Sequence, residues 1–425
     1  MKILLIYVIT ENVNIPVMPL GMACVAASVQ NAGHTVKSVS MSPEDIAPMI
    51  GAAMSDFTPD IIGISVRNID DQKMRNPVFL LDPVRSAVSC CRRLSVAPIV
   101  LGGAGYSIFP ESVLRFTGAD MGIQGEGESA FPALVERISR HEPIQDIAGL
   151  LLAGQTPLSA KRVPERLDAH PMAPLELLKS LSTGLEKQDF WLPCQTRRGC
   201  PMKCSYCSTP QIEGEILRQK PVDRVIRELE GYAAAGFRRI FFVDNTFNIP
   251  PSYARTLCEA IIQAGLKISW RCILYPWKAD PDLIRKMAAA GCAEVSLGFE
   301  SGNLEILGRM NKKFTPQEVR QCSDLLKTNG IRRTGFLLLG GPGENLNTVM
   351  ESLAFAESLK LDALKLTAGI RIYPNTPLAR CAIEEGVIHP EDDLLHPEFY
   401  LAKGLEQRLF QIVEIWAAER PYCLF

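Results

Sequence analysis

Three cysteines stand within eight residues of one another in the stretch R-R-G-C-P-M-K-C-S-Y-C-S-T-P, residues 197–210. They are Cys200, Cys204 and Cys207, and this stretch contains no fourth cysteine. Thiolate side chains bind soft and borderline metals such as iron and zinc. The spacing therefore predicts a metal centre in which the protein supplies three ligands and leaves one coordination position for another molecule.

Three interpretations of this stretch compete. Three incidental cysteines are disfavoured by their local density. A zinc site would need a fourth ligand, but Cys194 lies upstream in a predicted strand and no histidine occurs between His170 and His389. An iron–sulfur cluster, normally held by four thiolates, would keep one iron unligated by protein. Such an open position is typical of a catalytic rather than a structural metal site.

The composition is that of a globular protein with two or three domains. The chain has 425 residues, of which 47% are apolar and 22% charged, and its net charge is -2. No Lys/Arg-rich block suggests nucleic acid as a partner, and no apolar run reaches the roughly 18 residues of a membrane span. The first ten residues are expected to form a buried strand rather than a signal peptide. We expect a cytoplasmic protein, in which the thirteen cysteines are not structural disulfides by default.

The elements that position the cysteines form two series of alternating strands and helices. In the first series, strands are predicted at residues 2–8, 36–41, 61–66, 97–103 and near 121. Continuous β-branched runs among them are typical of parallel strands covered on both faces. The sequence therefore predicts a doubly wound, Rossmann-like α/β domain over residues 1–140. Its ligand is expected outside the carboxyl ends of the strands.

Residues 141–187 are rich in proline and predict a linker with one hairpin. In the second series, strands are predicted at residues 192–198, 239–243, 267–274, 293–299, 334–339 and 363–372. Six strands with intervening helices predict an open sheet or a partial (β/α)6 TIM-type barrel over residues 188–375. Residues 376–425 are expected to form a short C-terminal helical extension. The cysteine stretch follows the first of these strands, at the end where barrel enzymes place their chemistry.

The cysteine stretch resembles the C-x3-C-x2-C motif of the radical SAM superfamily, in which an aromatic residue such as Tyr206 usually precedes the last cysteine. The resemblance implies a [4Fe-4S] cluster ligated by Cys200, Cys204 and Cys207. Its fourth iron would bind S-adenosyl-L-methionine (SAM), which the family cleaves to methionine and a 5′-deoxyadenosyl radical. A six-stranded partial barrel is the fold of that family, in agreement with the predicted strands.

Four later segments resemble the SAM-binding motifs of the same family, and their order along the chain makes the resemblance specific. They are F-F-V-D-N-T-F-N, S-L-G-F-E-S-G, G-F-L-L-L-G-G-P-G-E and R-I-Y-P-N-T-P-L. The resemblance implies contacts with the SAM amino group, with its ribose and carboxylate, and with its adenine. The residues expected to bind SAM are Tyr206, Asp244, Asn245, Glu300, Ser301, Gly340, Gly341 and Arg371.

The first domain resembles the cobalamin-binding domain of those radical SAM enzymes that use both cofactors. The similar segments include P-D-I-I-G-I-S-V-R and I-V-L-G-G-A-G-Y-S-I-F-P-E, with G-I-Q-G-E-G-E after them. Paired glycines let backbone approach a bulky ligand, which the resemblance implies is the nucleotide tail of cobalamin. The residues expected to bind cobalamin are Pro19, Leu20, Ser65, Val66, Arg67, Asn68, Gly102, Gly103, Tyr106, Gly125 and Glu126.

The loop after the first strand departs from many cobalamin-binding domains. Those carry D-x-H-x-x-G, whose histidine ligates cobalt, whereas residues 10–21, T-E-N-V-N-I-P-V-M-P-L-G, contain no histidine. His34 is interpreted as structural. We therefore expect cobalamin to bind base-off without a histidine ligand, with Arg67 and Asn68 near the lower face of cobalt.

The two resemblances together imply a class B radical SAM methyltransferase. One SAM would methylate cobalamin, and a second would supply the radical that takes hydrogen from an unactivated carbon, which then receives the methyl group. Substrate contacts are expected from Tyr106, Phe109, Arg271, Tyr275 and Trp277 and from the C-terminal segment. The expected partners are a small molecule, left open as lipid-like, polyketide-like or aromatic, and an electron donor such as flavodoxin or ferredoxin.

Other functions stay open at this point. A cobalamin-dependent cyclase or ring-rearranging enzyme would share both domains. A methylthiotransferase should carry further cluster cysteines in its first domain, and Cys24, Cys90 and Cys91 are not spaced that way. A carrier of cobalamin or of a cluster that performs no catalysis would not need the SAM-binding motifs.

Overall fold

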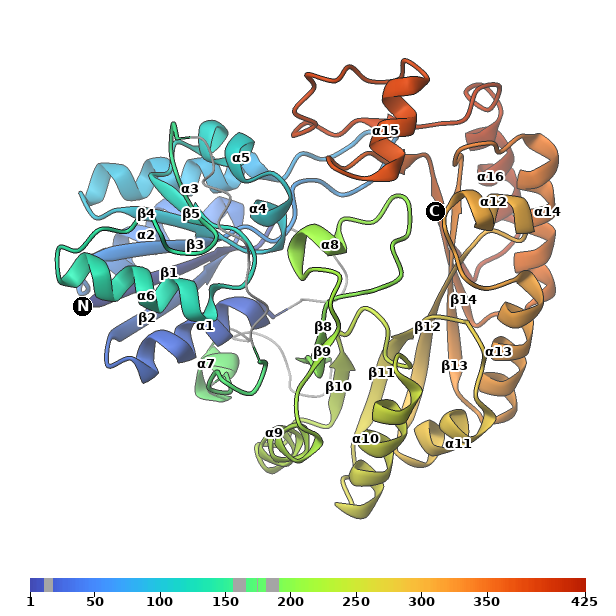
Figure 1. Cartoon of the computed structure of the whole chain (residues 1–425), viewed down its shortest axis with the longest axis horizontal. Coiled ribbons are helices and arrows are strands. Elements are labelled where there is room, and N and C mark those ends of the chain that lie inside the picture. Colours follow the sequence, from blue (N-terminus) through green and yellow to red (C-terminus); the bar gives the residue numbers. More distant parts are fainter. Residues whose placement is uncertain (11–17, 156–165, 174, 181–190) are drawn as a thin grey trace. The chain divides into compact units, whose positions relative to one another are not determined.

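The computed structural model describes residues 1–10, 18–155, 166–173, 175–180 and 191–425. The chain divides into two compact units (Figure 1). The first unit comprises Met1–Asp71, Pro77–Leu185 and Gln211–Gly214, and the second comprises Gln72–Asn76, Glu186–Pro210 and Glu215–Phe425.

The first unit is built on a six-stranded sheet with the order β2-β1-β3-β4-β5-β6, parallel except where β6 joins β5. Its strands are β1 (Lys2–Val8), β2 (Thr35–Met41), β3 (Ile61–Ser65), β4 (Ile99–Gly102), β5 (Met121–Ile123) and β6 (Leu150–Leu152). Its helices are α1 (Leu20–Asn31), η1 (Pro43–Asp45), α2 (Ile46–Ser55), α3 (Leu81–Leu94), α4 (Ala104–Ile108), α5 (Pro110–Thr117), α6 (Gly127–Ser139) and α7 (Leu175–Ser180). Strands and helices alternate as predicted, and the order β2-β1-β3-β4 reverses direction after β1, as in doubly wound sheets.

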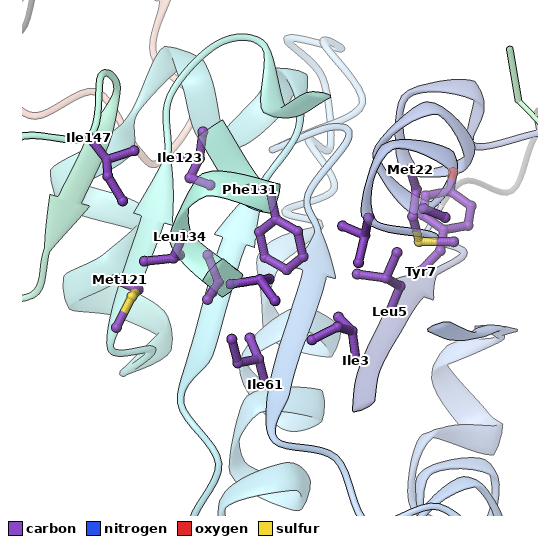
Figure 2. Packing of buried hydrophobic residues seen from close by; sticks show 14 residues of the cluster. Ile3, Leu5, Tyr7, Met22, Ile61, Met121, Ile123, Phe131, Leu134 and Ile147 are labelled. Carbon is purple, nitrogen blue, oxygen red and sulfur yellow. The ribbon is translucent and has the colours of Figure 1, made fainter. Parts of the chain in front are cut away.

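Apolar side chains of the sheet pack against α1 and α6 in a single cluster (Figure 2). Phe131 of α6 lies close to the central strands in this cluster. A Cβ atom on Gly63 of β3 would come within 2.7 Å of Leu5 and 3.3 Å of Phe131. Glycine at this position therefore lets the helix approach the sheet closely.

The region 141–187, predicted as a linker with one hairpin, contributes to the first unit. Its strand β6 pairs antiparallel with β5, with Gly122 opposite Leu151, and α7 contacts α1. Residues 156–165, 174 and 181–187 of this region, including Pro157, Pro164 and Pro174, lie outside the described residues. The domain boundaries at 140 and 187 stay a prediction.

The second unit is built on a seven-stranded parallel sheet with the order β17-β14-β13-β12-β11-β10-β7. Its strands are β7 (Leu192–Cys194), β10 (Arg239–Phe242), β11 (Ser269–Leu274), β12 (Cys292–Glu300), β13 (Arg332–Leu339), β14 (Ala363–Ala368) and β17 (Cys423–Leu424). Two small antiparallel pairs join β8 (Arg197–Arg198) to β9 (Arg218–Gln219) and β15 (Ile370–Arg371) to β16 (Phe399–Tyr400).

Helices connect successive strands of this sheet, as a partial β/α barrel requires (Figure 1). They are α8 (Thr209–Ile212), α9 (Val222–Ala234), α10 (Pro251–Gln263), α11 (Pro281–Ala289), α12 (Leu304–Arg309), α13 (Pro316–Thr328), α14 (Leu346–Ser358), α15 (Pro377–Glu384) and α16 (Leu409–Ala418). The predicted α/β class and partial barrel are confirmed.

The strands of the second unit differ from the prediction at three places. The first predicted barrel strand is interrupted after Cys194, and the last is interrupted at Gly369, whose φ of +80° is left-handed. The seventh strand, β17, was not predicted, because two residues are too few to show a periodic pattern.

Alternation along β11 shows which face of the barrel sheet its side chains occupy. Trp270, Cys272 and Leu274 are buried, and the indole Nε1 of Trp270 donates a hydrogen bond to the carbonyl of Ala290, next to the end of α11, at 2.7 Å. Successive side chains point to opposite faces of a strand. Arg271 therefore lies on the inner face of the sheet, away from these helices.

Candidate cofactor and substrate sites

The loop that carries the three predicted cluster ligands lies between β8 and α8 and is held from two other loops. The amide of Ser205 donates to the carbonyl of Met310 at 3.1 Å, and the carbonyl of Ser205 accepts from the amide of Leu378 at 2.9 Å. The side chain of Asn311 donates to the carbonyl of Lys203 at 2.6 Å. Backbone contacts to the ends of α12 and α15 thus position this cluster loop.

The three cysteine thiols are partly buried, and burial raises the pKa of two of them. Burial raises the pKa of Cys200 to about 11. Burial also raises the pKa of Cys204, although the nearby Lys312 ammonium acts in the opposite direction. Within the described part of the chain, no three Cys, His, Asp or Glu side chains are grouped so that they could hold one ion. Ligation of the three cysteines to separate irons of a cluster stays a prediction, and it would stabilise their thiolates.

Lys312 is a residue of this site that the sequence analysis did not identify. Its side chain is only 5% exposed, and its Nζ lies 3.2 Å from Glu300 Oε1 and 5.2 Å from the centre of the Tyr206 ring. Burial opposes the charge, but attraction to Glu300, Tyr206 and Cys204 keeps the pKa of Lys312 well above its ordinary value. Sequence pattern alone does not distinguish it from the exposed Lys313.

Thr209 connects a cluster ligand to a predicted SAM contact. Its hydroxyl lies 3.2 Å from the sulfur of Cys207 and 3.5 Å from Oδ1 of Asn245. A thiolate accepts hydrogen bonds, so a hydroxyl at this position can donate to the ligated sulfur. Asn245 is thereby placed beside the cluster loop, where the SAM amino group is expected.

Asp244 has protein partners where a SAM contact was expected. Its carboxylate has no exposed surface and accepts hydrogen bonds from the amides of Thr196 and Arg197 and from the Thr196 hydroxyl. The buried Arg197 guanidinium lies 3.2 Å away. These contacts assign Asp244 to holding the chain just before the cluster loop, and a contact with SAM would require it to exchange partners.

Glu300 and Ser301 point in different directions. Glu300 ends β12 with a φ of +60°, which is uncommon for a residue other than glycine. Ser301 has no exposed surface and its hydroxyl lies 2.9 Å from that of Ser352 in α14. Its hydroxyl also accepts from the amide of Asn303 at 3.1 Å. Ser301 therefore anchors the end of β12 to α14, and its contact with the SAM ribose stays a prediction.

The Gly340-Gly341 turn at the end of β13 is held by a buried carboxylate. Oε2 of Glu344 accepts from both glycine amides, at 2.9 Å from Gly341, and the carbonyl of Gly340 accepts from the amide of Ala402 at 2.9 Å. Burial raises the pKa of Glu344 to about 7. Both amides are occupied, so any contact with adenine would use the Cα atoms and carbonyls of this turn.

Arg371 binds the C-terminal segment. Its buried guanidinium donates to the carbonyls of Ile372 at 2.6 Å and Leu394 at 2.7 Å, with longer contacts to Leu395 and Glu398. The predicted contact of Arg371 with SAM is therefore not the one that the structure shows. Arg371 instead fixes residues 394–398 against β15.

The predicted substrate residues of the barrel occupy different environments. Tyr275 is 5% exposed, and its hydroxyl accepts from the amide of Lys313 at 2.8 Å, so it supports the loop that carries Lys312. Trp277 is half-buried. Arg271 is half-buried on the inner face of the sheet.

In the first unit, the predicted cobalamin residues lie at one edge of the sheet. Pro19 and Leu20 lie at the start of α1, and the others follow the carboxyl ends of β3, β4 and β5 directly. Because these strands are parallel, their carboxyl ends meet at the same edge, where doubly wound sheets bind ligands. Residues 11–17 of the histidine-free loop lie outside the described residues.

The two glycines after β4 have different surroundings. Gly103 has a φ of +102°, and a Cβ there would come within 2.5 Å of the carbonyl oxygen of Val66. Gly102 has only one atom within 4 Å of such a Cβ, at 3.9 Å. The predicted close approach at Gly103 is thus an approach of the chain to itself, and Gly102 is the position that leaves room for a ligand.

Ser107, which the sequence analysis did not identify, links the two glycine loops. Its hydroxyl donates to the carbonyl of Gly103 at 2.8 Å and accepts from the amide of Gly125 at 2.9 Å. Its own carbonyl accepts from the side chain of Gln124 at 2.9 Å. A serine four residues after a glycine pair is a weak signal, so only the fold shows this role. Glu126, the next residue of the second loop, precedes α6 without capping it through its side chain.

Tyr106 and Phe109, expected near cobalamin or the substrate, are buried in the first unit. The Tyr106 ring lies directly against Gly122 of β5, where a Cβ atom would collide with it. Its hydroxyl is buried without a hydrogen-bond partner among the described residues, and burial raises the pKa of Tyr106. Neither ring presents an open surface in this structure.

His34 has the structural position that we expected. Its Nδ1 lies 3.3 Å from the N-terminal amine and its Nε2 3.4 Å from Glu136 in α6. Arg67 and Asn68 are partly buried just after β3, and the carbonyl of Arg67 lies where a Cβ on Gly105 would come within 2.9 Å. Their predicted place near the lower face of cobalt stays a prediction.

Comparison with known proteins matches both domains. Residues 6–135 match the B12 binding domain, and residues 195–356 match the radical SAM superfamily. The chain is 28% identical over 91% of its length to an uncharacterized methyltransferase of Pyrococcus horikoshii, 84% of which is covered. It is 22% identical over 88% of its length to tryptophan 2-C-methyltransferase of Streptomyces laurentii, 74% of which is covered.

Solved structures show the same fold over the whole chain. Radical S-adenosylmethionine methyltransferase TsrM from Kitasatospora setae superposes with a TM-score of 0.86 at 20% identity, covering 100% of this chain and 90% of TsrM. The cobalamin-dependent S-adenosylmethionine radical enzyme OxsB gives a TM-score of 0.74 at 16% identity, covering 98% of this chain and 66% of OxsB.

The chain is therefore a radical SAM enzyme whose barrel follows a B12 binding domain. Within that superfamily it belongs to the cobalamin-dependent branch that includes methyltransferases. Its cofactors are a [4Fe-4S] cluster, SAM and cobalamin.

Proposed function

We propose that this enzyme transfers a methyl group to an unactivated carbon of a small molecule. One observation carries the proposal. The same chain has a three-cysteine loop in a radical SAM domain and a domain that matches the B12 binding domain. When bound, these cofactors supply a 5′-deoxyadenosyl radical and a methyl group carried on cobalt. Relatives named as methyltransferases at 22–28% identity support this function.

Different residues of the barrel unit hold the cluster loop and bind SAM beside it. Backbone contacts from α12 and α15 hold the cluster loop, and Asn245 lies beside Thr209 next to that loop. Lys312 presents a buried ammonium next to Cys204, where an anionic group of SAM would find a positive partner that costs no further desolvation. We assign the SAM carboxylate to Lys312, with Glu300 orienting the ammonium.

The experiment is anaerobic reconstitution of the full chain with iron, sulfide and cobalamin, followed by incubation of candidate substrates with methyl-labelled SAM. Methyl transfer predicts labelled product together with both S-adenosylhomocysteine and 5′-deoxyadenosine. Deoxyadenosine without S-adenosylhomocysteine would contradict methyl transfer and indicate ring closure or rearrangement instead. A Cys207→Ala variant, which should lose deoxyadenosine formation, is the control for cluster chemistry.

Methylthio transfer is disfavoured by the first unit. It would need a second set of cluster cysteines there, whereas Cys24 lies in α1 and Cys90 and Cys91 are buried in α3. No described helix is long and apolar enough to cross a membrane. We propose that a small electron-transfer protein such as a flavodoxin or ferredoxin reduces the cluster. The cytoplasmic location stays a prediction.

A further inference from the structure

Arg271 is a cation on the inner face of the barrel whose donors are not all used. Its Cζ lies 4.5 Å from the centre of the Phe241 ring and 4.9 Å from that of Trp191. Its Nε is buried and has no hydrogen-bond partner among the described residues. Burial lowers the pKa of Arg271, and Glu294 opposes this only by longer-range attraction. The carboxylate of Glu294 instead accepts from the Thr334 hydroxyl at 3.3 Å.

A fully buried arginine of the barrel, Arg333, offers a comparison with the half-buried Arg271. Arg333 of β13 faces the helices, and each of its three nitrogens has a partner. Its Nε lies 3.4 Å from Asp362, and its two terminal nitrogens donate to Ser323, to Leu359 and to Lys360. Leaving a buried donor unpaired costs about 1–3 kcal/mol. The unpaired Nε of Arg271 therefore points to a ligand that pairs it.

The surroundings of Arg271 select the chemistry of that ligand. Aromatic rings that lie against a guanidinium leave its in-plane N–H edges for hydrogen bonding. Those edges match a carboxylate or phosphate, which accepts two parallel N–H bonds. Arg239 is a second cation over the same Trp191 ring, with its Cζ 5.8 Å from the ring centre, but its side chain is exposed.

We propose that Arg271 binds a carboxylate or phosphate group of the substrate. This inference rests on the proposed function only in assigning the inner face of the barrel to the substrate. In the sheet, Arg271 is paired with Glu294 of the neighbouring strand. Glu300, near the cluster loop, lies six positions after Glu294 on that strand. At about 3.3 Å per residue this is roughly 20 Å along the strand. The substrate is therefore an elongated molecule with its anionic group remote from the methylated carbon, rather than a neutral lipid.

The test is calorimetric titration of the anaerobic holoenzyme with three probes. These are 3-phenylpropionate, phenyl phosphate and, as a neutral match, 3-phenylpropanol. We expect one anionic probe to bind more tightly than the alcohol, and the tighter of the two identifies the group. Arg271→Gln should weaken that probe at least about tenfold, the lower bound for a charged hydrogen bond, without affecting the alcohol. Arg271→Lys keeps the charge but lacks the two parallel N–H donors of the guanidinium, so it should lose part of the affinity.

The matched control is Arg239→Gln, which removes the same charge from the exposed neighbour over the same Trp191 ring. It should change the affinity for the anionic probe by less than about twofold. An equal loss of affinity in both variants would indicate non-specific attraction by positive charge and would overturn the proposal. Equal affinity of the anions and the alcohol for the unmodified enzyme would also overturn it. Anion binding at Arg271 without any methyl transfer would refute the proposed function and leave this inference standing.

Discussion

Replacing Lys312 by methionine should destabilise the barrel unit strongly, because it leaves a carboxylate buried without its partner. The side chains of Lys312 and Glu300 are 5% and 13% exposed, with Nζ and Oε1 3.2 Å apart. Removing one member of a buried ion pair costs about 3–5 kcal/mol, whereas removing both can cost little. We therefore expect Lys312→Met to lose about 3–5 kcal/mol and the double variant with Glu300→Gln to recover most of that loss.

The assay is urea unfolding of the apoprotein followed by tryptophan fluorescence. The four tryptophans of the chain, Trp191, Trp270, Trp277 and Trp416, all belong to the second unit, so the signal reports that unit. Lys313→Met is the control, because its side chain is exposed and should change stability by less than about 0.5 kcal/mol. A double variant as unstable as Lys312→Met would refute the buried pair. SAM binding to the holoenzyme, measured separately, should weaken in Lys312→Met and not in the control.

Three further predictions concern other parts of the two sites. Burial raises the pKa of Glu344 from 4.5 to about 7, so between these pH values the folded state binds a proton that the unfolded state has released. The free energy of unfolding should therefore fall by about 3 kcal/mol as the pH rises through this window. Glu344→Gln should flatten this dependence in urea unfolding at pH 5 and pH 8. Thr209→Val should lower the midpoint potential of the cluster, because a hydrogen bond to a ligating sulfur is lost, and Thr209→Ser should restore it in a redox titration followed by electron paramagnetic resonance; an unchanged potential would contradict the contact. Gly103→Ala should weaken cobalamin binding and lower the melting temperature of the first unit, since its Cβ would lie 2.5 Å from a carbonyl at a left-handed φ, whereas Gly102→Ala should leave the melting temperature nearly unchanged.

Several site residues were predictable because spacing and order are local properties of the chain. Cys200, Cys204 and Cys207 lie in one loop whatever the rest of the fold does. The glycine-rich turns after β4 and β5 meet at one sheet edge because parallel strands share their carboxyl ends. Motif order therefore predicted both cofactor regions and the class of enzyme.

The orientation of individual side chains was harder to predict, although part of it follows from strand alternation. Ile240 and Phe242 of β10 are buried, so Asp244 continues towards the same side and Asn245 points to the other. The same alternation turns Ser301 away from Glu300. A shift of one residue moves a side chain to the opposite face, and motif resemblance by itself does not record that parity.

By itself, the sequence determined the two α/β units, the three thiolates and the positions of the glycine turns, because these depend on local spacing and on the periodicity of apolar residues. Only the tertiary structure decided that Lys312 is buried against Glu300, that Arg371 holds the C-terminal segment, and that Arg271 keeps an unpaired donor on the inner face. Each of these outcomes depends on groups brought together from distant parts of the chain. Their contacts set burial and charge, which no single stretch of residues contains.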